Sequence, residues 1–207
     1  MSTTDPPQAQ RRGRRQLLLL AALFFVPLAV AFWLYYGPAT WRPAGGTNQG
    51  DLIDPAVPLP RVALRDAAGN QLPEDLLVGK WTMLYVGDGA CDERCRKALY
   101  LARQTRLAVN RDMGRVQRVF LVTANCCDTA FLAAEHPDLR IAVLGTDARS
   151  QDLLAAMPAV GAASAATAGR LYLVDPLGNA LLSYSAAAPD KALLTDLRKL
   201  LRLSHIG

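Results

Sequence analysis

The clearest feature of the hydropathy pattern is an uninterrupted apolar run near the N-terminus. Residues 17–36 (LLLLAALFFVPLAVAFWLYY) contain no charged side chain. At about 1.5 Å rise per residue, a helix of this length spans roughly 30 Å, the thickness of the hydrocarbon core of a bilayer. The run is longer than the apolar part of a cleaved signal peptide, roughly 7–15 residues, and no small-residue cleavage site follows it directly. The pattern therefore predicts an uncleaved transmembrane anchor.

Beyond this run the pattern changes twice. Residues 37–60 are rich in glycine and proline and have almost no periodicity, which is typical of a linker. From residue 61 to residue 207, short apolar runs alternate with amphipathic stretches, which is typical of a folded domain. The chain thus divides into a basic leader over residues 1–16, the anchor over 17–36, a linker over 37–60 and one domain over 61–207.

Within the domain, the periodicity predicts a succession of short strands and helices. A turn cluster over residues 66–70 (DAAGN) predicts a small β-hairpin at the start. Expected strands are 81–86, 116–123, 141–144, 171–175 and 180–184. Expected helices are 92–111, 129–135, 150–157 and 190–203, the third with Ser150 as its N-cap. This order predicts an α/β fold, a thioredoxin-like mixed sheet flanked by helices with an added N-terminal β-hairpin.

The charge distribution indicates the orientation of the anchor. Arg11, Arg12, Arg14 and Arg15 precede it, and basic residues stay on the cytoplasmic side of a membrane. The domain is therefore expected outside, in the periplasm if the cell is bacterial, with the anchor in the inner membrane. The leader, with Asp5 included, contributes +3 of the formal +5, so the remainder of the chain carries only +2. This small surplus argues against a nucleic-acid-binding protein.

Four cysteines outside the cytoplasm would usually form two structural disulfides, but the spacing of Cys91 and Cys95 favours chemistry. The pair joins the first buried strand to the first long helix, where the helix dipole and free N–H groups favour a thiolate. Acidic and basic neighbours within residues 92–97 act on it in opposite directions. One helical turn apart, the two thiols can close a disulfide or hold Cu(I). As a mere staple, a loop of three residues adds little stability.

The motifs around this pair resemble the Sco/SenC family of copper chaperones for cytochrome c oxidase. Residues 79–81 (GKW) lead into a strand, and residues 87–95 read GDGACDERC where the family typically reads GYTxCPxxC. The hairpin near residues 66–69 and the stretch 172–178 (YLVDPLG) are also similar, so the resemblance covers about residues 59–205. It implies an anchored assembly factor whose partners are an oxidase subunit with copper-binding cysteines and a thiol reductant, with copper as the metal handled.

One departure from the family concerns the third copper ligand. Sco proteins place a histidine five residues before the aromatic residue of the Tyr-Leu strand, and here that position is Thr167. The two histidines of the chain, His136 and His205, are expected to be solvated surface residues, His136 at a helix end. Cu(II), which favours imidazole ligands, lacks its usual partner, whereas Cu(I) can bind two thiolates alone. The departure favours thiol–disulfide exchange over copper binding.

A second thiol pair, Cys126 and Cys127, ends the strand predicted at residues 116–123. If this strand runs parallel to the first, both thiol loops open at the same edge of the sheet. A bond between adjacent cysteines is strained and readily reducible. Three interpretations of these two cysteines remain: a resolving thiol for the first pair, an additional metal ligand, or a plain buried cysteine.

The sequence thus favours a Sco-like oxidase assembly factor that acts by thiol–disulfide exchange, by Cu(I) handling or by both, through Cys91 and Cys95. Two other classes of function stay open. A general periplasmic thiol–disulfide oxidoreductase or peroxidase-like enzyme would need an exposed, reactive Cys91. A non-catalytic docking module would use the fold as a surface, with the thiols as staples.

Overall fold

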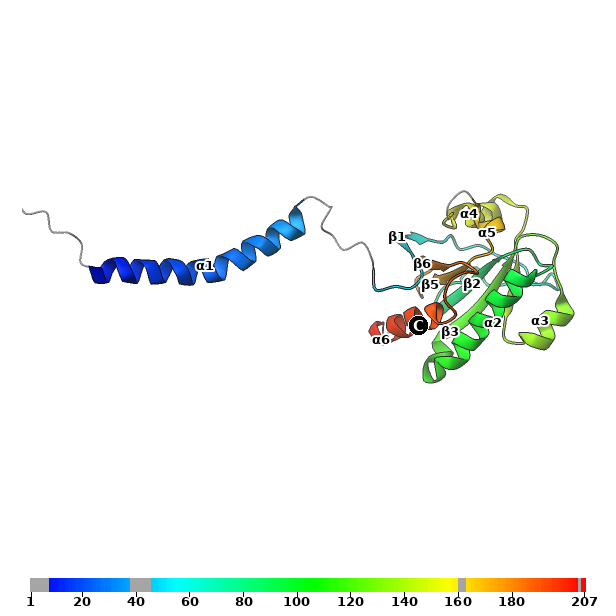
Figure 1. Ribbon diagram of the computed structural model, residues 1–207. Helices are drawn as coiled ribbons and strands as arrows, with labels where there is room; N and C mark the ends of the chain where they lie inside the picture. The colour runs from blue at the N-terminus through cyan, green and yellow to red at the C-terminus, as the bar shows by residue number, and fades with distance from the viewer. Residues whose placement is uncertain (1–7, 38–45, 160–162, 205) are drawn as a thin grey trace, which may run out of the picture. The chain divides into compact units, whose positions relative to one another are not determined.

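A computed structural model describes residues 8–37, 46–159, 163–204 and 206–207, in an N-terminal unit that ends at Gly45 and a C-terminal unit over 46–207. The N-terminal unit contains one helix, α1 (Gln8–Tyr36), which includes the predicted anchor and begins before the arginines. The stretch Arg12–Tyr36 is long and apolar enough to cross a membrane. Figure 1 shows α1 bent along its length, and Pro27 inside the helix accounts for a bend because it removes a backbone donor.

The C-terminal unit is built on a six-stranded mixed sheet in the order β1-β6-β5-β2-β3-β4 (Figure 1). Strands β2, β3 and β4 run parallel, with β4 at the edge, whereas β5, β6 and β1 are joined by antiparallel pairing. The strands are β1 (Asp51–Pro58), β2 (Trp81–Gly87), β3 (Val116–Val122), β4 (Arg140–Val143), β5 (Leu171–Val174) and β6 (Asn179–Tyr184). The predicted α/β mixed sheet is confirmed.

Helices cover both faces of this sheet. One face packs against α2, α3 and α6, and the other against α4, α5 and the segment over residues 59–77. The helices are α2 (Glu93–Ala108), α3 (Thr129–Glu135), α4 (Ala148–Ala156), α5 (Ala165–Ala168) and α6 (Ala192–Leu203), with a 3-10 helix η2 (Asn110–Arg115) after α2. The two layers are the physical reason that the central strands read as continuous apolar runs.

Strand β2 fixes the position of the first thiol loop. All seven of its residues are buried, with Met83 and Tyr85 facing the α2 side and Leu84 and Val86 facing the α4 side. The strand ends at Gly87, opposite Val122 of the parallel neighbour β3. Parallel strands present their carboxyl ends at one edge, so the loops after β2 and β3 start next to each other.

The structure differs from the sequence-based expectation in the segment before this sheet. Residues 51–58, expected in the linker, form the edge strand β1, while linker residues 38–45 lie outside the described part of the chain. The buried Asp196 carboxylate accepts the backbone N–H groups of Gln49 and Gly50 at 2.9–3.0 Å, which anchors this strand beside β6. The pattern missed the strand because its two prolines and exposed positions give no apolar periodicity.

Smaller differences concern turns and caps. The predicted hairpin is present as a single bridge between Arg65 and Gln71 around a turn in which Asp66 accepts backbone hydrogen bonds. The N-cap of α4 is Asp147, not Ser150, and its carboxylate accepts the Ser150 N–H at 3.0 Å. The predicted helix over 92–111 ends at Ala108, shortly before Asn110 adopts a left-handed φ of 48°.

Candidate functional site

Cys91 and Cys95 form a disulfide at the start of α2, with 5.0 Å between their Cα atoms. Cys95 belongs to the first turn of the helix and Cys91 immediately precedes the N-cap residue, Asp92. Both cysteines are almost inaccessible, with 2% and 1% of their surfaces exposed. The first thiol pair is therefore a closed bond beneath the surface, packed into the core on the α2 side of the sheet.

The loop that carries Cys91 is held by local hydrogen bonds. The backbone N–H of Cys91 donates to the carbonyl of Asp88 at 3.2 Å, and the Asp88 carboxylate accepts the N–H of Ala90 at 2.8 Å. From the helix side, Nε of Arg96 donates to the Cys91 carbonyl at 3.2 Å. Cys91 itself adopts φ 50°, a left-handed conformation that costs a residue other than glycine about 1–2 kcal/mol. Such strain is typical of functional sites.

Asp92 caps the N-terminus of α2 and carries a negative charge there. Its carboxylate accepts the N–H of Cys95 at 3.0 Å. This hydrogen bond is the largest cause of a lowered pKa for Asp92, and Arg94 acts in the same direction. The Asp92 carboxylate thus binds the Cys95 N–H group, one of the helix N–H groups that were expected to stabilise a thiolate. It also adds a negative charge beside the disulfide.

The basic residues around the pair are each matched by an acidic partner. The sequence alone left the net effect of the acidic and basic neighbours on the thiolate open. In the folded domain the basic charges are compensated, which weakens their influence. The ion pairs are Arg94–Asp92 at 3.0 Å, Arg96–Asp128 at 3.1 Å and Lys97–Asp190 at 3.7 Å. The helix end therefore supplies no large uncompensated positive charge to the thiols.

A cavity of about 500 Å³ opens beside the disulfide. Cys95 lines it, together with Tyr85, Asp92 and Thr167. Burial, and secondarily the charge of Asp92, raises the pKa of Tyr85 to about 12, so its hydroxyl stays protonated at neutral pH. The position that is a histidine in Sco proteins thus faces the same cavity as the thiol pair, but it offers a hydroxyl in place of an imidazole.

The donor set beside the pair does not complete a Sco-type copper site. In the ranges that the structure describes, no three His, Cys, Asp or Glu side chains gather in a way that could hold a metal ion. Threonine and carboxylate oxygens in the cavity are hard ligands, which suit Cu(I) poorly. Reduced Cys91 and Cys95 would offer two thiolates alone, enough for near-linear Cu(I) and insufficient for Cu(II).

The expectation for His136 was wrong in one respect. It does end a helix, as the C-cap of α3, but it is buried, with 4% of its surface exposed. Its Nδ1 lies 3.3 Å from a guanidinium nitrogen of Arg118, and its ring packs edge-on against Phe131. Burial, and then the neighbouring charges of Arg118 and Arg103, lower its pKa. His136 belongs to the core, whereas His205 lies outside the described residues.

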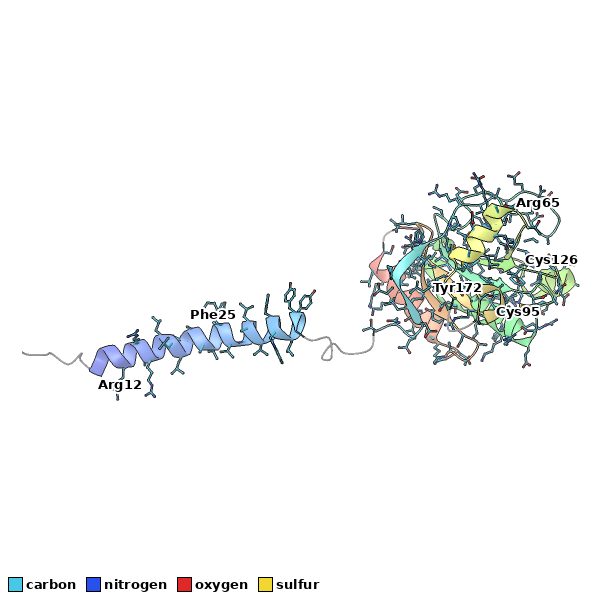
Figure 2. All side chains as sticks on the ribbon, turned by 90° about the horizontal axis from the view of Figure 1, so that it is seen from above. Arg12, Phe25, Arg65, Cys95, Cys126 and Tyr172 are labelled. Atoms are coloured by element: carbon cyan, nitrogen blue, oxygen red, sulfur yellow. A yellow bond between two sulfur atoms is a disulfide. The ribbon has the colours of Figure 1, made fainter. Side chains whose placement is uncertain are left out.

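The second thiol pair lies in the loop after β3. Cys126 and Cys127 are joined by a disulfide, with Cα atoms 3.1 Å apart. Cys126 is exposed, whereas Cys127 is half-buried and packs on the hydrophobic cluster that contains Cys91 and Cys95. The expectation that both thiol loops open at one edge of the sheet is confirmed by the parallel pairing of β2 and β3. Figure 2 shows the positions of Cys95 and Cys126 in the domain.

The two loops are bonded to each other through Gly89. Its N–H donates to the carbonyl of Ala124 at 2.8 Å, and its carbonyl accepts the N–H of Asp128 at 3.2 Å. A Cβ at position 89 would lie 2.6 Å from the Asn125 carbonyl oxygen and 2.8 Å from the Cα of Cys126. Only glycine allows this close approach of the two loops at position 89.

Sequence reasoning did not single out Gly89 or Tyr85. A signal for the glycine was present in the loop motif GDGAC, but the atoms that exclude a side chain there belong to the end of β3 and the loop after it, 33 or more residues away. Tyr85 looked like an ordinary member of a buried strand. Its position as a cavity wall follows from the end of β2 at Gly87, near which Tyr85 and Cys95 line the same cavity.

Comparisons with known proteins agree with this geometry. Residues 7–38 match the family described as "Transmembrane-like, N-terminal domain", and no curated protein matches the chain. The domain is similar in structure to apo Sco1 from Thermus thermophilus, at 17% identity and a TM-score of 0.56, over 76% of this chain and 99% of that one. Yeast Sco1 with copper bound gives 18% and 0.57, over 73% and 96%.

The thioredoxin domain of a thiol-disulfide oxidoreductase from Bacteroides vulgatus is also similar, at 20% identity and a TM-score of 0.50, over 69% of this chain and 94% of that one. At such identities the likeness establishes the fold alone. The Sco-like fold is therefore confirmed, and the apolar helix, long enough to cross a membrane, lies in the segment that matches the transmembrane-like family model. Because residues 81–204 match the family model as well, the chain belongs to the family described as "Transmembrane-like, thioredoxin-like, C-terminal domain".

Proposed function

We propose that this protein is a Sco-like assembly factor for cytochrome c oxidase that keeps the copper-binding cysteines of an oxidase subunit reduced. The observation that carries the proposal is the Cys91–Cys95 disulfide at the start of α2, beside a cavity that Thr167 lines at the Sco histidine position. Thiol exchange needs a nucleophile, a resolving thiol and access. Cys91 and Cys95 supply the first two, and the cavity supplies the third.

The reaction is a transfer of two electrons to the partner. With the pair reduced, the Cys95 thiolate attacks one sulfur of the partner disulfide, and the other partner sulfur leaves as a thiolate and takes a proton. Cys91 then attacks the Cys95 sulfur, which re-forms the Cys91–Cys95 bond and releases the second partner thiol. We assign the first attack to Cys95 because it lines the cavity. Tyr85 also lines this cavity, and its hydroxyl, protonated at neutral pH, is a hydrogen-bond donor for a partner group.

Transient Cu(I) transfer is a second candidate. The one-turn spacing of the two thiols, with Cα atoms 5.0 Å apart, favours it because two thiolates at this spacing suit near-linear Cu(I) coordination. Copper would then be cargo held by Cys91 and Cys95 alone. Anaerobic Cu(I) titration of the reduced chain is expected to show one ion bound, lost in Cys91→Ser and kept in Cys126→Ser/Cys127→Ser. Absence of binding in the unmodified chain would exclude this second role and leave the exchange reaction.

The same proposal includes a location. The arginines at positions 12, 14 and 15 within α1 support a cytoplasmic N-terminus, and hence a periplasmic domain anchored in a bacterial inner membrane. A periplasm-dependent reporter fused after Gly207 is expected to be active. A reporter that is active only in the cytoplasm would reverse this topology, and with it the access to an oxidase partner on the outer side.

A trapping experiment tests the exchange reaction. The reduced full chain, in detergent, is mixed with an oxidised peptide that carries the copper-binding cysteine pair of the oxidase subunit. The unmodified chain is expected to reduce the peptide. Cys91→Ser should stop at a stable mixed disulfide between Cys95 and the peptide, because the resolving thiol is missing. Cys95→Ser should give neither product. Peptide reduction that proceeds equally in both variants would overturn the proposal.

The other two classes of function predict different results in this experiment. A general oxidoreductase would reduce unrelated disulfide peptides as quickly as the oxidase peptide, although the 2% exposure of Cys91 argues against such breadth. A docking module would reduce none of them. Comparison of the oxidase peptide with a scrambled peptide of the same composition therefore separates the three.

A further inference from the structure

The two disulfides of this domain differ sharply in access. Cys91 and Cys95 are 2% and 1% exposed, whereas Cys126 is exposed to solvent and its neighbour Cys127 is half-buried. A thiolate must approach a disulfide sulfur directly to break the bond. The active-site cysteine of a folded reductant protein can meet this requirement at the exposed Cys126, whereas the first pair is almost inaccessible apart from the cavity that Cys95 lines.

The Cys126–Cys127 pair also contacts residues that surround the buried Cys91–Cys95 pair. Cys127 packs on the cluster of buried residues to which Cys91 and Cys95 belong. Gly89, two residues before Cys91, lies so close to Cys126 that a Cβ would come within 2.8 Å of its Cα. A further bond, from the Asn125 side chain to the Asp88 carboxylate at 2.7 Å, fixes the two loops together. The two pairs therefore belong to loops that are bonded together, with Cys126 exposed and Cys127 packed against the cluster that contains Cys91 and Cys95.

From this arrangement we infer that Cys126 and Cys127 are an electron-entry pair, which receives two electrons from a dithiol reductant protein and passes them to the Cys91–Cys95 disulfide. The inference rests on the proposed exchange function, which requires reduction of Cys91 and Cys95 after each cycle. Neither Cys126 nor Cys127 lines the cavity beside Cys95. The reductant and the oxidase partner would thus use different entrances to the same buried pair.

In the first half of the relay, the reductant reduces the Cys126–Cys127 disulfide. A thiolate of the reductant attacks the sulfur of Cys126, and the sulfur of Cys127 leaves and takes a proton. The second thiol of the reductant attacks its own mixed disulfide, which forms the reductant's disulfide and releases Cys126 as a thiol.

In the second half, the reduced Cys126/Cys127 pair reduces the Cys91–Cys95 disulfide. The Cys127 thiolate attacks one sulfur of the Cys91–Cys95 bond, and the other sulfur leaves and is protonated. Cys126 then attacks the sulfur of Cys127, which restores the Cys126–Cys127 bond and frees the second buried thiol. The net result is one oxidised reductant and one reduced Cys91/Cys95 pair, so two electrons and two protons have moved inward.

Reduction kinetics followed by peptide mapping test the relay. The oxidised full chain, in detergent, is treated with reduced thioredoxin as the dithiol probe or with a phosphine reductant, which needs no thiol relay. Samples are quenched with acid at intervals, labelled with a maleimide and digested with trypsin. Cleavage after Arg94 places Cys91 and Cys95 in separate peptides, and both other cysteines fall within residues 119–140.

In the unmodified chain, thioredoxin is expected to reduce the Cys91–Cys95 bond. In Cys126→Ser/Cys127→Ser, this reaction should slow at least tenfold, while reduction by the phosphine changes less than twofold. Thr129→Ser, an exposed polar change in the same segment, serves as the matched control and should leave both rates unchanged. Equal thioredoxin rates in the unmodified chain and the double variant would overturn the relay.

A single variant gives a test that does not depend on rates or on the folding of the double variant. In Cys126→Ser, the resolving thiol is absent, so Cys127 is expected to remain bonded to Cys91 or Cys95 and to yield a cross-linked peptide that contains residues 119–140. Absence of this cross-link overturns the relay. Failure of the exchange function is recognised separately in the trapping experiment, where the fully reduced chain would then leave the oxidase peptide oxidised.

Discussion

The loops after β2 and β3 contain similar parts in a different order. Each follows one of two parallel neighbouring strands, each carries a thiol pair, and each has an aspartate that caps the next helix. In the first loop Asp92 lies between the two cysteines and accepts the N–H of Cys95. In the second, Asp128 follows both cysteines and accepts the N–H of Phe131.

This order decides where the sulfur atoms lie. A cap between the cysteines draws the second one into the first helical turn, and both become buried against the core. A cap after the cysteines leaves them on the loop, and Cys126 stays exposed. The position of one aspartate relative to two cysteines therefore separates a protected pair from an accessible pair, which a comparison of cysteine content alone cannot show.

The largest effect is expected from a substitution that breaks the contact between the two thiol loops. Gly89→Ala places a Cβ within 2.6–2.9 Å of atoms of Asn125, Cys126 and Val122, two of them backbone atoms that cannot rotate away. We expect the loops to separate, with a loss of about 2–3 kcal/mol in the free energy of unfolding, measured as the urea midpoint of the full chain in detergent.

Gly114→Ala is the matched control for this substitution. No atom lies within 4 Å of a Cβ built at Gly114, so the change should be neutral or slightly stabilising. Equal urea midpoints for the two variants would mean that the loops do not depend on their contact at Gly89.

The second-largest expected effect is a pH dependence of stability that arises at the helix after the second loop. His136 ends α3, the helix after the second loop, and the charged groups that act on it are Arg118, Arg103, Glu135 and Asp138. Burial lowers its pKa in the folded state, so the unfolded chain binds a proton first as the pH falls below about 6.5.

The protein should therefore lose stability below that pH, by no more than about 1.4 kcal/mol at pH 5.5 from this residue, given an ordinary pKa of about 6.5. Urea midpoints measured from pH 7.5 to pH 5.5 check this, and His136→Gln should flatten the slope. A slope that persists in His136→Gln would assign the effect to other groups.

The sequence was sufficient for the parts that depend on local pattern. The apolar runs at residues 81–86 and 116–123 predicted β2 and β3 almost to the residue, and the spacing of Cys91 and Cys95 predicted two thiols within reach of each other. These features depend on continuous apolar runs and on a spacing of one helical turn, which the chain displays directly.

The parts that the sequence could not predict depend on neighbours distant in the chain. Edge strand β1 forms because Asp196 anchors the residues before it, and the burial of His136 depends on its packing near Arg118. The cavity wall at Thr167 could be proposed only through the family resemblance. A local pattern contains no signal for contacts of this kind.

A smaller effect compares the two caps. Asp92→Ala and Asp128→Ala each remove a side-chain acceptor from a helix N-terminus, at a cost of about 1 kcal/mol. Because only Asp92 binds the residue that carries a buried thiol, Asp92→Ala should also speed reduction of the Cys91–Cys95 bond by a phosphine. Asp128→Ala should not. Peptide mapping after a timed quench measures this difference, and equal rates would show that the cap does not protect the bond.

The smallest expected effect concerns charge alone. Asp92→Asn retains a good N-cap residue and removes the negative charge beside the reduced pair, so the thiolate fraction of Cys95 should rise. An interaction of about 0.3–1 kcal/mol at a helix terminus corresponds to a roughly two- to fivefold faster alkylation by iodoacetamide at pH 7. Asp128→Asn is the control, because its carboxylate pairs with Arg96 and caps the other helix. If both variants accelerate Cys95 equally, the charge acts over the whole edge of the sheet, and the order of cap and cysteine controls burial but not reactivity.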